Sequence, residues 1–169
     1  MSVEIRFDPH QRYQREAIDA VVEVFAGQEG LKQGRGMPSP TEDGSLFEEF
    51  VFGNSLKLSP ETVTKNLRRV QDRPVFLEDG SEVPAIAESL RRDIADGEMP
   101  VHFNVEMETA TGKTYVYLRT IAELHERYGL RKFVIVVPSV AIREGVLNSL
   151  GLLRDHVRDL YGGLQLNHE

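Results

Sequence analysis

The fold of this chain is decided by residues 101–114, which read VHFNVEMETATGKT. Val101, Phe103 and Val105 alternate with polar residues, so their spacing predicts a strand over residues 101–106 with one apolar face. A loop follows at residues 107–112. Residues 113–128 then show the spacing of a helix, which Gly129 is placed to end. One face of that helix consists of Leu118, Ile121, Ala122 and His125.

A second strand is predicted over residues 132–137, because the run KFVIVV is largely apolar and β-branched. Such a run is typical of a strand that is buried on both faces of a parallel sheet. Strand, helix and strand within roughly 37 residues make a βαβ unit, whose crossover is expected to be right-handed. A further helix is predicted from about Ser139 to Leu150. We therefore expect an α/β fold with a parallel sheet.

The earlier part of the chain has less regular patterning. Residues 11–26 predict an amphipathic helix, with apolar side chains at Ala17, Ile18, Val21, Val22 and Phe25. Residues 27–45 mix glycine and proline with polar residues, which indicates a long loop or a disordered segment. Residues 59–97 regain order: Ser59 and Pro60 have the form of a helix start, with an apolar stripe of Val63, Leu67 and Val70 behind them. A short strand is predicted at residues 75–77, before a turn at residues 78–81.

A second helix is predicted to begin at Pro84 and to end at Asp96-Gly97, with Ile86, Leu90 and Ile94 facing inward. These patterns divide the chain into three regions. They are an N-terminal helix region at residues 1–26, an insertion at residues 27–98, and the βαβ part at residues 99–169.

Composition limits the classes of protein that this chain can represent. A length of 169 residues with 40% hydrophobic content suffices for one domain with a real core. The start has no secretory signal, and the longest apolar run, residues 133–137, is far shorter than a membrane span. No cysteine is present and the five histidines are scattered, so no structural metal is expected. The net charge of −7 gives no overall attraction to nucleic acid, so any DNA contact must be local.

The segment at residues 107–114 ends in Gly112-Lys113-Thr114, the tail of a phosphate-binding loop. Amides at a helix start surround a phosphate, and the helix dipole favours its negative charge. Lys113 would reach the outer phosphates as a point charge, while the Thr114 hydroxyl would be a ligand of Mg²⁺ held by the nucleotide. Three such residues alone would be weak evidence, but their place between a strand and a helix is the context that the motif requires. Met107 and Ala110 depart from the usual glycines, and a methyl group at Ala110 would crowd the loop if that residue needed a positive φ.

Two stretches resemble the start of the ATPase in the nuclease-helicase subunit of type III restriction enzymes. The first is FNVEMETATGKTYVYLRTI at residues 103–121, and the second is KFVIVVPSVAIREGV at residues 132–146. Methionine in the first loop position is common in that family, whereas Ala110 stands where glycine is usual. The resemblance extends over about residues 103–150 and more weakly over 7–25, which makes residues 27–98 a family-specific insertion.

The resemblance implies an incomplete RecA-like P-loop NTPase lobe of a superfamily 2 helicase-like motor. Such a cytoplasmic motor would use ATP and Mg²⁺ to move along double-stranded DNA, together with a modification methyltransferase subunit, and would have no membrane partner. Lys113 and Thr114 would serve hydrolysis. The nucleotide would be bound by Gln14, Met107, Thr109, Ala110, Thr111, Gly112, Lys113 and Thr114.

The resemblance also suggests roles outside the loop. Gln14 would read the adenine edge, with Gln11 as a less favoured substitute, because an amide can donate and accept at once. Ser139 and Arg143 would contact the DNA backbone. The alternatives are structural: Gln14 as one polar residue on a helix face, Ser139 as a helix cap and Arg143 as a solvated charge.

Hydrolysis also needs a carboxylate pair after an apolar strand, to hold Mg²⁺ and position water. After Lys113, the apolar run at residues 133–137 ends in Pro138-Ser139, and no later apolar run is followed by Asp-Glu. We therefore expect an N-terminal fragment or a truncated product that binds ATP without turnover by itself. A non-hydrolysing nucleotide-binding or assembly module is the alternative. A small-molecule P-loop kinase is disfavoured, because no arginine-rich lid follows the βαβ unit.

Overall fold

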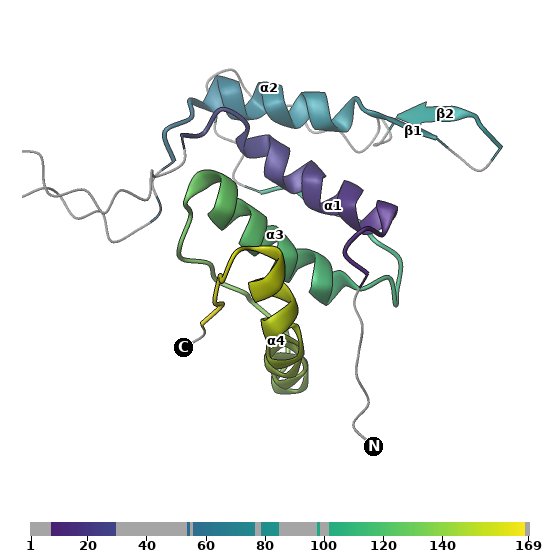
Figure 1. The fold of residues 1–169 in the computed structure, drawn as a ribbon. Coiled ribbons are helices and arrows are strands. Elements are labelled where there is room, and N and C mark those ends of the chain that lie inside the picture. Colours follow the sequence, from purple (N-terminus) through teal and green to yellow (C-terminus); the bar gives the residue numbers. More distant parts are fainter. Residues whose placement is uncertain are drawn as a thin grey trace, which may run out of the picture.

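The structure is a computed structural model that describes residues 8–29, 54, 56–76, 79–84, 98 and 102–167. Its helices are α1 (Arg12–Val22), continued by the 3₁₀ turn η1 (Glu23–Phe25), α2 (Pro60–Gln71), α3 (Lys113–Tyr128) and α4 (Val140–Leu160). They lie in successive layers, with α2 over the end of α1, α1 over α3, and α4 beneath α3 (Figure 1). Helix α3 is therefore the central element and contacts both α1 and α4.

The N-terminal amphipathic helix is confirmed as α1 and η1. Ile18 and Val22 are almost fully buried and pack with Val116 and Leu124 of α3. The apolar stripe that its sequence predicts is thus the surface that fixes α1 against the central helix.

Helix α2 begins where the sequence predicts. The Ser59 hydroxyl accepts a hydrogen bond from the Thr62 amide at 3.3 Å, and Pro60 occupies the first helical position. Val63 and Leu67 pack against Val24 of η1. Asn66, which is also buried, donates to the carbonyls of Val24 and Ala26 and so satisfies the end of the 3₁₀ turn.

The short strand near residue 75 is present, but the helix start predicted at Pro84 is wrong. Pro84 ends strand β2 (Glu82–Pro84), which pairs antiparallel with β1 (Pro74–Phe76) and places Pro84 opposite Pro74. A proline lacks an amide hydrogen and is tolerated at the end of an edge strand, so it does not by itself mark a helix start here. Residues 85–97, which carry the rest of the predicted helix, lie outside the described residues.

The central helix has the predicted bounds, and Gly129 caps it with a left-handed φ of 69°. The following helix is longer than predicted: α4 passes through Gly151 and ends at Leu160 rather than near residue 150. Leu153 and Val157 are buried against Leu118 and Ala122 of α3. Their burial outweighs the cost of about 1 kcal/mol for a glycine inside a helix.

The parallel sheet that the sequence predicts is not formed among the described residues. Residues 102–108 and 131–137 carry no strand pairing there, and Val134 and Val136 are 89% and 88% exposed. At the start of the second run, the Asn54 side chain accepts from the Arg131 and Lys132 amides and donates to the Lys132 carbonyl. A strand forms its ladder only when a neighbouring strand supplies partners. In the described part of the chain, the Asn54 side chain supplies hydrogen-bond partners for the backbone of Arg131 and Lys132.

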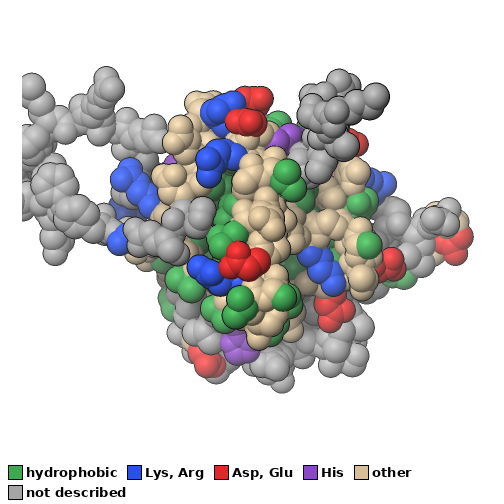
Figure 2. All heavy atoms as spheres, turned by 90° about the horizontal axis from the view of Figure 1, so that it is seen from below, with side chains coloured by type: hydrophobic (Ala, Val, Ile, Leu, Met, Phe, Trp, Pro, Cys, Tyr) green, Lys and Arg blue, Asp and Glu red, His purple; other side chains and the backbone are tan. Residues whose placement is uncertain are grey.

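The face seen in Figure 2 carries exposed hydrophobic side chains among scattered charges. Lys and Arg side chains on this face lie beside Asp and Glu rather than in one continuous basic area (Figure 2). No helix within the described ranges is both long and apolar enough to cross a membrane.

Candidate nucleotide-binding site

The loop at residues 107–112 leads directly into the first turn of α3. It bends through two left-handed residues, Ala110 with φ of 65° and Gly112 with φ of 85°. The Thr111 hydroxyl donates to the Glu108 carbonyl at 2.7 Å and closes the bend. By helix geometry, the amides at the start of α3 have no carbonyl one turn earlier, so they are available to an anion. The loop therefore has the backbone form that a phosphate requires.

Ala110 has a positive φ of 65°, the conformation in which its methyl group was expected to crowd the loop. It is the one non-glycine residue with positive φ among the described residues. The left-handed conformation costs an L-residue roughly 1–2 kcal/mol. This strain is stored in the loop itself, at a residue that is exposed.

Gln14 lies directly on this loop. Its side-chain Nε2 donates to the Thr111 carbonyl at 3.0 Å, although the two residues are 97 positions apart. The contact leaves no space at Gly112, where an added Cβ would lie 2.6 Å from Nε2 of Gln14. Gln14 is only 8% exposed. Of the two glutamines considered, Gln14 is the one that the structure brings to the loop.

Gln11 has a different environment. Its Oε1 accepts the hydroxyl of Tyr13 at 2.5 Å, and it stands at the start of α1 without capping the helix. The Oε1 of Gln14, by contrast, has no hydrogen-bond donor among the described residues. Gln14 thus binds the loop through its amide nitrogen and keeps an acceptor oxygen for another partner.

The charged and hydroxyl groups of the loop lie at its outer side. Lys113 and Thr109 are exposed and Thr114 is partly buried in the first turn of α3. Met107 instead packs with the apolar cluster between α1 and α3, which also contacts Phe133. Met107 therefore anchors the loop, while Lys113 and Thr114 present the groups that suit phosphate and a nucleotide-held Mg²⁺. Within the described residues, no cluster of three or more His, Asp or Glu side chains is arranged to hold a metal by itself.

Ser139 and Arg143 lie at the start of α4 rather than at the loop. The Ser139 hydroxyl accepts from the Ile142 amide at 3.3 Å and caps the helix. Arg143 is 59% exposed at its side chain and pairs with Glu144 at 3.0 Å. Ser139 thus acts as a helix cap and Arg143 as an exposed charge, as the structural alternative expected. Contact of these residues with DNA stays a prediction.

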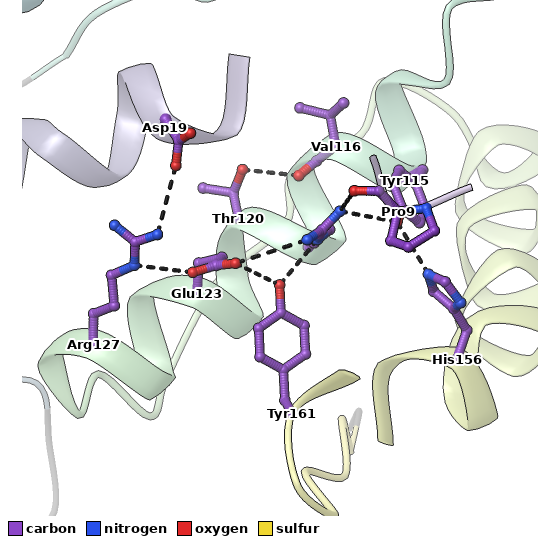
Figure 3. Close-up of polar contacts among 10 residues, drawn as sticks. Pro9, Asp19, Tyr115, Val116, Thr120, Glu123, Arg127, His156 and Tyr161 are labelled. Atoms are coloured by element: carbon purple, nitrogen blue, oxygen red, sulfur yellow. Dashed lines mark hydrogen bonds and ion pairs between the residues drawn. The ribbon is translucent and has the colours of Figure 1, made fainter. Parts of the chain in front are cut away.

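A buried polar network behind the loop was not predicted from the sequence. Arg119 and Glu123 on α3 are 5% and 9% exposed, and they meet Tyr161 at the end of α4 (Figure 3). Burial, the largest effect, raises the pKa of Tyr161 to about 12. Its hydroxyl is protonated, donates to Glu123 at 2.9 Å and accepts from Arg119 at 3.0 Å. The available signal was an Arg and a Glu one turn apart, beside Leu118 and Ala122 on the inward part of the helix.

Comparison with known proteins assigns this chain to a family. A family model described as "Type III restriction enzyme, res subunit" matches residues 9–161, and so includes residues 27–98. The chain is 29% identical over 163 residues to the EcoPI Res subunit of Escherichia phage P1, and 30% identical over 163 residues to the EcoP15I Res subunit of Escherichia coli. Both matches cover 95% of this chain and 14% of the relative. The StyLTI Res subunit of Salmonella typhimurium is 52% identical over 62 residues, which are 36% of this chain and 6% of that relative.

Proposed function

Because this chain belongs to the family of type III restriction enzyme Res subunits, we propose that it is the ATP-binding portion of an ATP-dependent DNA translocase and endonuclease. The chain spans about 14% of the length of the first two relatives. Cleavage, movement along DNA and pairing with a modification subunit are thus proposals about a longer protein.

The observation that carries the proposal is the geometry of the loop at residues 107–114. Ala110 and Gly112 turn the backbone through the left-handed region, immediately before the amides that begin α3. The positive end of the helix dipole favours a phosphate at this position. Lys113 contributes a positive charge that is exposed beside those amides, and Thr114 contributes a hydroxyl ligand for the metal. When bound, ATP would supply the phosphoryl group whose transfer to water releases the free energy that a motor uses, and Mg²⁺ would neutralise charge on the phosphates.

Lys113 provides the direct test of phosphate binding. In the full-length protein, Lys113→Ala removes a charge-assisted contact worth about 1.5–3 kcal/mol, which is roughly a tenfold to hundredfold loss of ATP affinity. Lys65→Ala, an exposed lysine of α2, is the matched control and should leave ATP affinity unchanged. Equal ATP binding by the Lys113 variant and the parent, measured by calorimetry, contradicts the assignment.

Base recognition by Gln14 is the second part of the proposal. Nε2 of Gln14 is held by the Thr111 carbonyl, so Oε1 would accept the exocyclic amine of adenine. Guanine has a carbonyl oxygen at that position, which would face another acceptor. The intact protein should therefore prefer ATP to GTP, and Gln14→Ala should narrow the preference. Equal losses for both nucleotides would make Gln14 a purely structural residue.

Contact with DNA is proposed at the start of α4. Ser139 and Arg143 are exposed at a helix N-terminus, where free amides favour a phosphate. The net charge of −7 opposes long-range attraction, so the contact has to be local. Ser139→Ala combined with Arg143→Ala should lower DNA-stimulated hydrolysis in the full-length protein and leave ATP binding intact. Arg158→Ala, at the other end of α4, is the control. Full DNA stimulation of hydrolysis in the double variant would mean that Ser139 is only a helix cap and Arg143 only a surface charge.

A further inference from the structure

We propose that Arg119 is a positioning residue for nucleotide-base selectivity, and that Tyr161 at the far end of α4 takes part by holding Arg119 in place. Arg119 would act by fixing the segment that leads into α1, and with it Gln14, against the phosphate loop. The inference rests on the proposed reading of adenine by Gln14. It adds Arg119 and Tyr161, whose hydrogen bonds go to Pro9, Tyr115 and Glu123 rather than to the loop.

The guanidinium of Arg119 joins three separate parts of the chain. Its Nη1 donates to the Pro9 carbonyl at 2.5 Å and to the Tyr115 hydroxyl at 3.2 Å. Its Nε donates to the Tyr161 hydroxyl at 3.0 Å, and its Nη2 lies 4.0 Å from Oε1 of Glu123. Figure 3 shows Pro9, Tyr115, Glu123 and Tyr161 converging from α3, the end of α4 and the segment before α1.

The Pro9 carbonyl connects this network to the segment that leads into α1 and Gln14. Residues 9 and 10 precede the helix, and the Gln11 carbonyl joins them to it by accepting from the Arg15 amide at 3.0 Å. Gln14 lies in the first turn of α1 and must move with that segment. The space around Gln14 is also tight, since a Cβ on Gly112 would lie only 2.6 Å from its Nε2. A small displacement of the segment would therefore break the 3.0 Å bond from Gln14 to Thr111.

Tyr161 determines how Arg119 is oriented. A tyrosine phenol is protonated at ordinary pH, and burial raises the pKa of Tyr161 further, to about 12. Its hydroxyl accepts from Arg119 and donates to Glu123 at once. Burial also acts to lower the pKa of Arg119, but Tyr161 and Tyr115 outweigh that effect and raise it. Arg119 is a charged donor that is held by several partners, and its Nη1 is directed at the Pro9 carbonyl.

Arg127 offers a comparison on the same helix. It pairs with Glu123 at 3.0 Å and with Asp19 of α1 at 3.6 Å, but its side chain is 40% exposed. The Asp19 end of that pair lies inside a helix that is held by its own backbone bonds. A half-exposed pair such as Arg127–Asp19, with side chains 40% and 29% exposed, contributes about 1 kcal/mol or less, so it has little influence on the first turn of α1. Arg127→Gln is thus a matched control for Arg119→Gln.

The experiment measures Kd for ATP and for GTP in the full-length protein, with the parent, Gln14→Ala, Arg119→Gln, Tyr161→Phe and Arg127→Gln. We expect Arg119→Gln to reduce the ATP-over-GTP preference by about fivefold or more, as expected for loss of one hydrogen bond. Tyr161→Phe keeps the positive charge and should reduce the preference in the same direction but less. Arg127→Gln should keep the parental preference. The double variant Gln14→Ala with Arg119→Gln should lose no more preference than Gln14→Ala alone.

A purely structural role for Arg119 gives a different result. Arg119→Gln would then weaken ATP and GTP equally, or its effect would add to that of Gln14→Ala, and either outcome overturns the proposal. If Arg119→Gln does not fold, the result for Tyr161→Phe decides: an unchanged preference overturns the proposal. If Gln14→Ala itself leaves the preference unchanged, the reading of adenine by Gln14 fails and this inference fails with it. If Gln14→Ala narrows the preference for ATP over GTP while Arg119→Gln keeps the parental preference, only the role of Arg119 is refuted.

Discussion

Replacement of Gly112 by alanine tests the contact between the first helix and the phosphate loop. An added Cβ at this position would lie 2.6 Å from Nε2 of Gln14 and 3.9 Å from Cβ of Tyr115. The first distance is too short for any contact, so the Gln14 side chain must shift. The φ of 85° at Gly112 also has to be kept, because α3 begins at the next residue.

The expected cost has two parts. The left-handed conformation costs an alanine roughly 1–2 kcal/mol. Displacement of Gln14 from the Thr111 carbonyl removes one hydrogen bond, worth about 1 kcal/mol. Gly112→Ala should therefore lower the free energy of unfolding by about 2–3 kcal/mol, which corresponds to a fall in Tm of roughly 5–10 °C for a chain of this size.

A double-mutant cycle with Gln14→Ala separates the two parts. In the Gln14→Ala background there is no side chain to displace, so Gly112→Ala should cost only about 1–2 kcal/mol there. Urea unfolding gives the four free energies. Gly145→Ala is the control: Gly145 lies inside α4 with nothing within 4 Å of an added Cβ, so this change should stabilise by about 0.5–1 kcal/mol. An equal cost of Gly112→Ala in both backgrounds would refute the contact with Gln14.

Three further predictions test other parts of the structure. Ala110→Gly should raise ATP affinity a few-fold and the free energy of unfolding by up to about 1 kcal/mol, because glycine adopts the φ of 65° without strain. Calorimetry measures the affinity and urea unfolding the stability; a less stable variant would show that Ala110 is not strained. Asn66→Ala leaves the carbonyls of Val24 and Ala26 without their donor and should cost about 1–3 kcal/mol, whereas a cost near zero would show that water replaces it. Burial, assisted by a nearby positive charge, lowers the pKa of His156, so the folded state binds fewer protons than the unfolded state and stability should fall as pH drops below about 6.5. His156→Gln should flatten that part of the Tm–pH curve, and an unchanged slope would assign the dependence to other groups.

Much of the local structure could be predicted from the sequence. The start of α2 at Ser59-Pro60, the start of α3 at Lys113 and its end at Gly129 all follow from signals within a few residues. Helix α1 follows from its apolar spacing. The bend at residues 107–112 follows in the same way, and Ala110 has the positive φ in which its methyl group was expected to crowd the loop. Phosphate binding at this loop stays a prediction. Consecutive residues share one backbone, so caps, turns and helical stripes need no knowledge of distant partners.

Other features depend on segments that are far apart in the sequence. The sequence offered both Gln14 and Gln11, and only the packing of α1 on α3 placed Gln14 on Thr111. The length of α4 was decided by burial of Leu153 and Val157, which outweighed the glycine at residue 151.

The same distinction explains the two largest differences between the sequence-based expectations and the structure. The run at residues 132–137 has the composition of a buried strand, yet Val134 and Val136 stay exposed because no paired neighbour lies among the described residues. Arg119 would ordinarily be assigned to a solvated face, but it is buried because the Pro9 carbonyl and Tyr161 supply its hydrogen bonds. Local backbone geometry is thus set by neighbouring residues, whereas pairing and burial depend on which distant segments meet, and only the tertiary structure determines that.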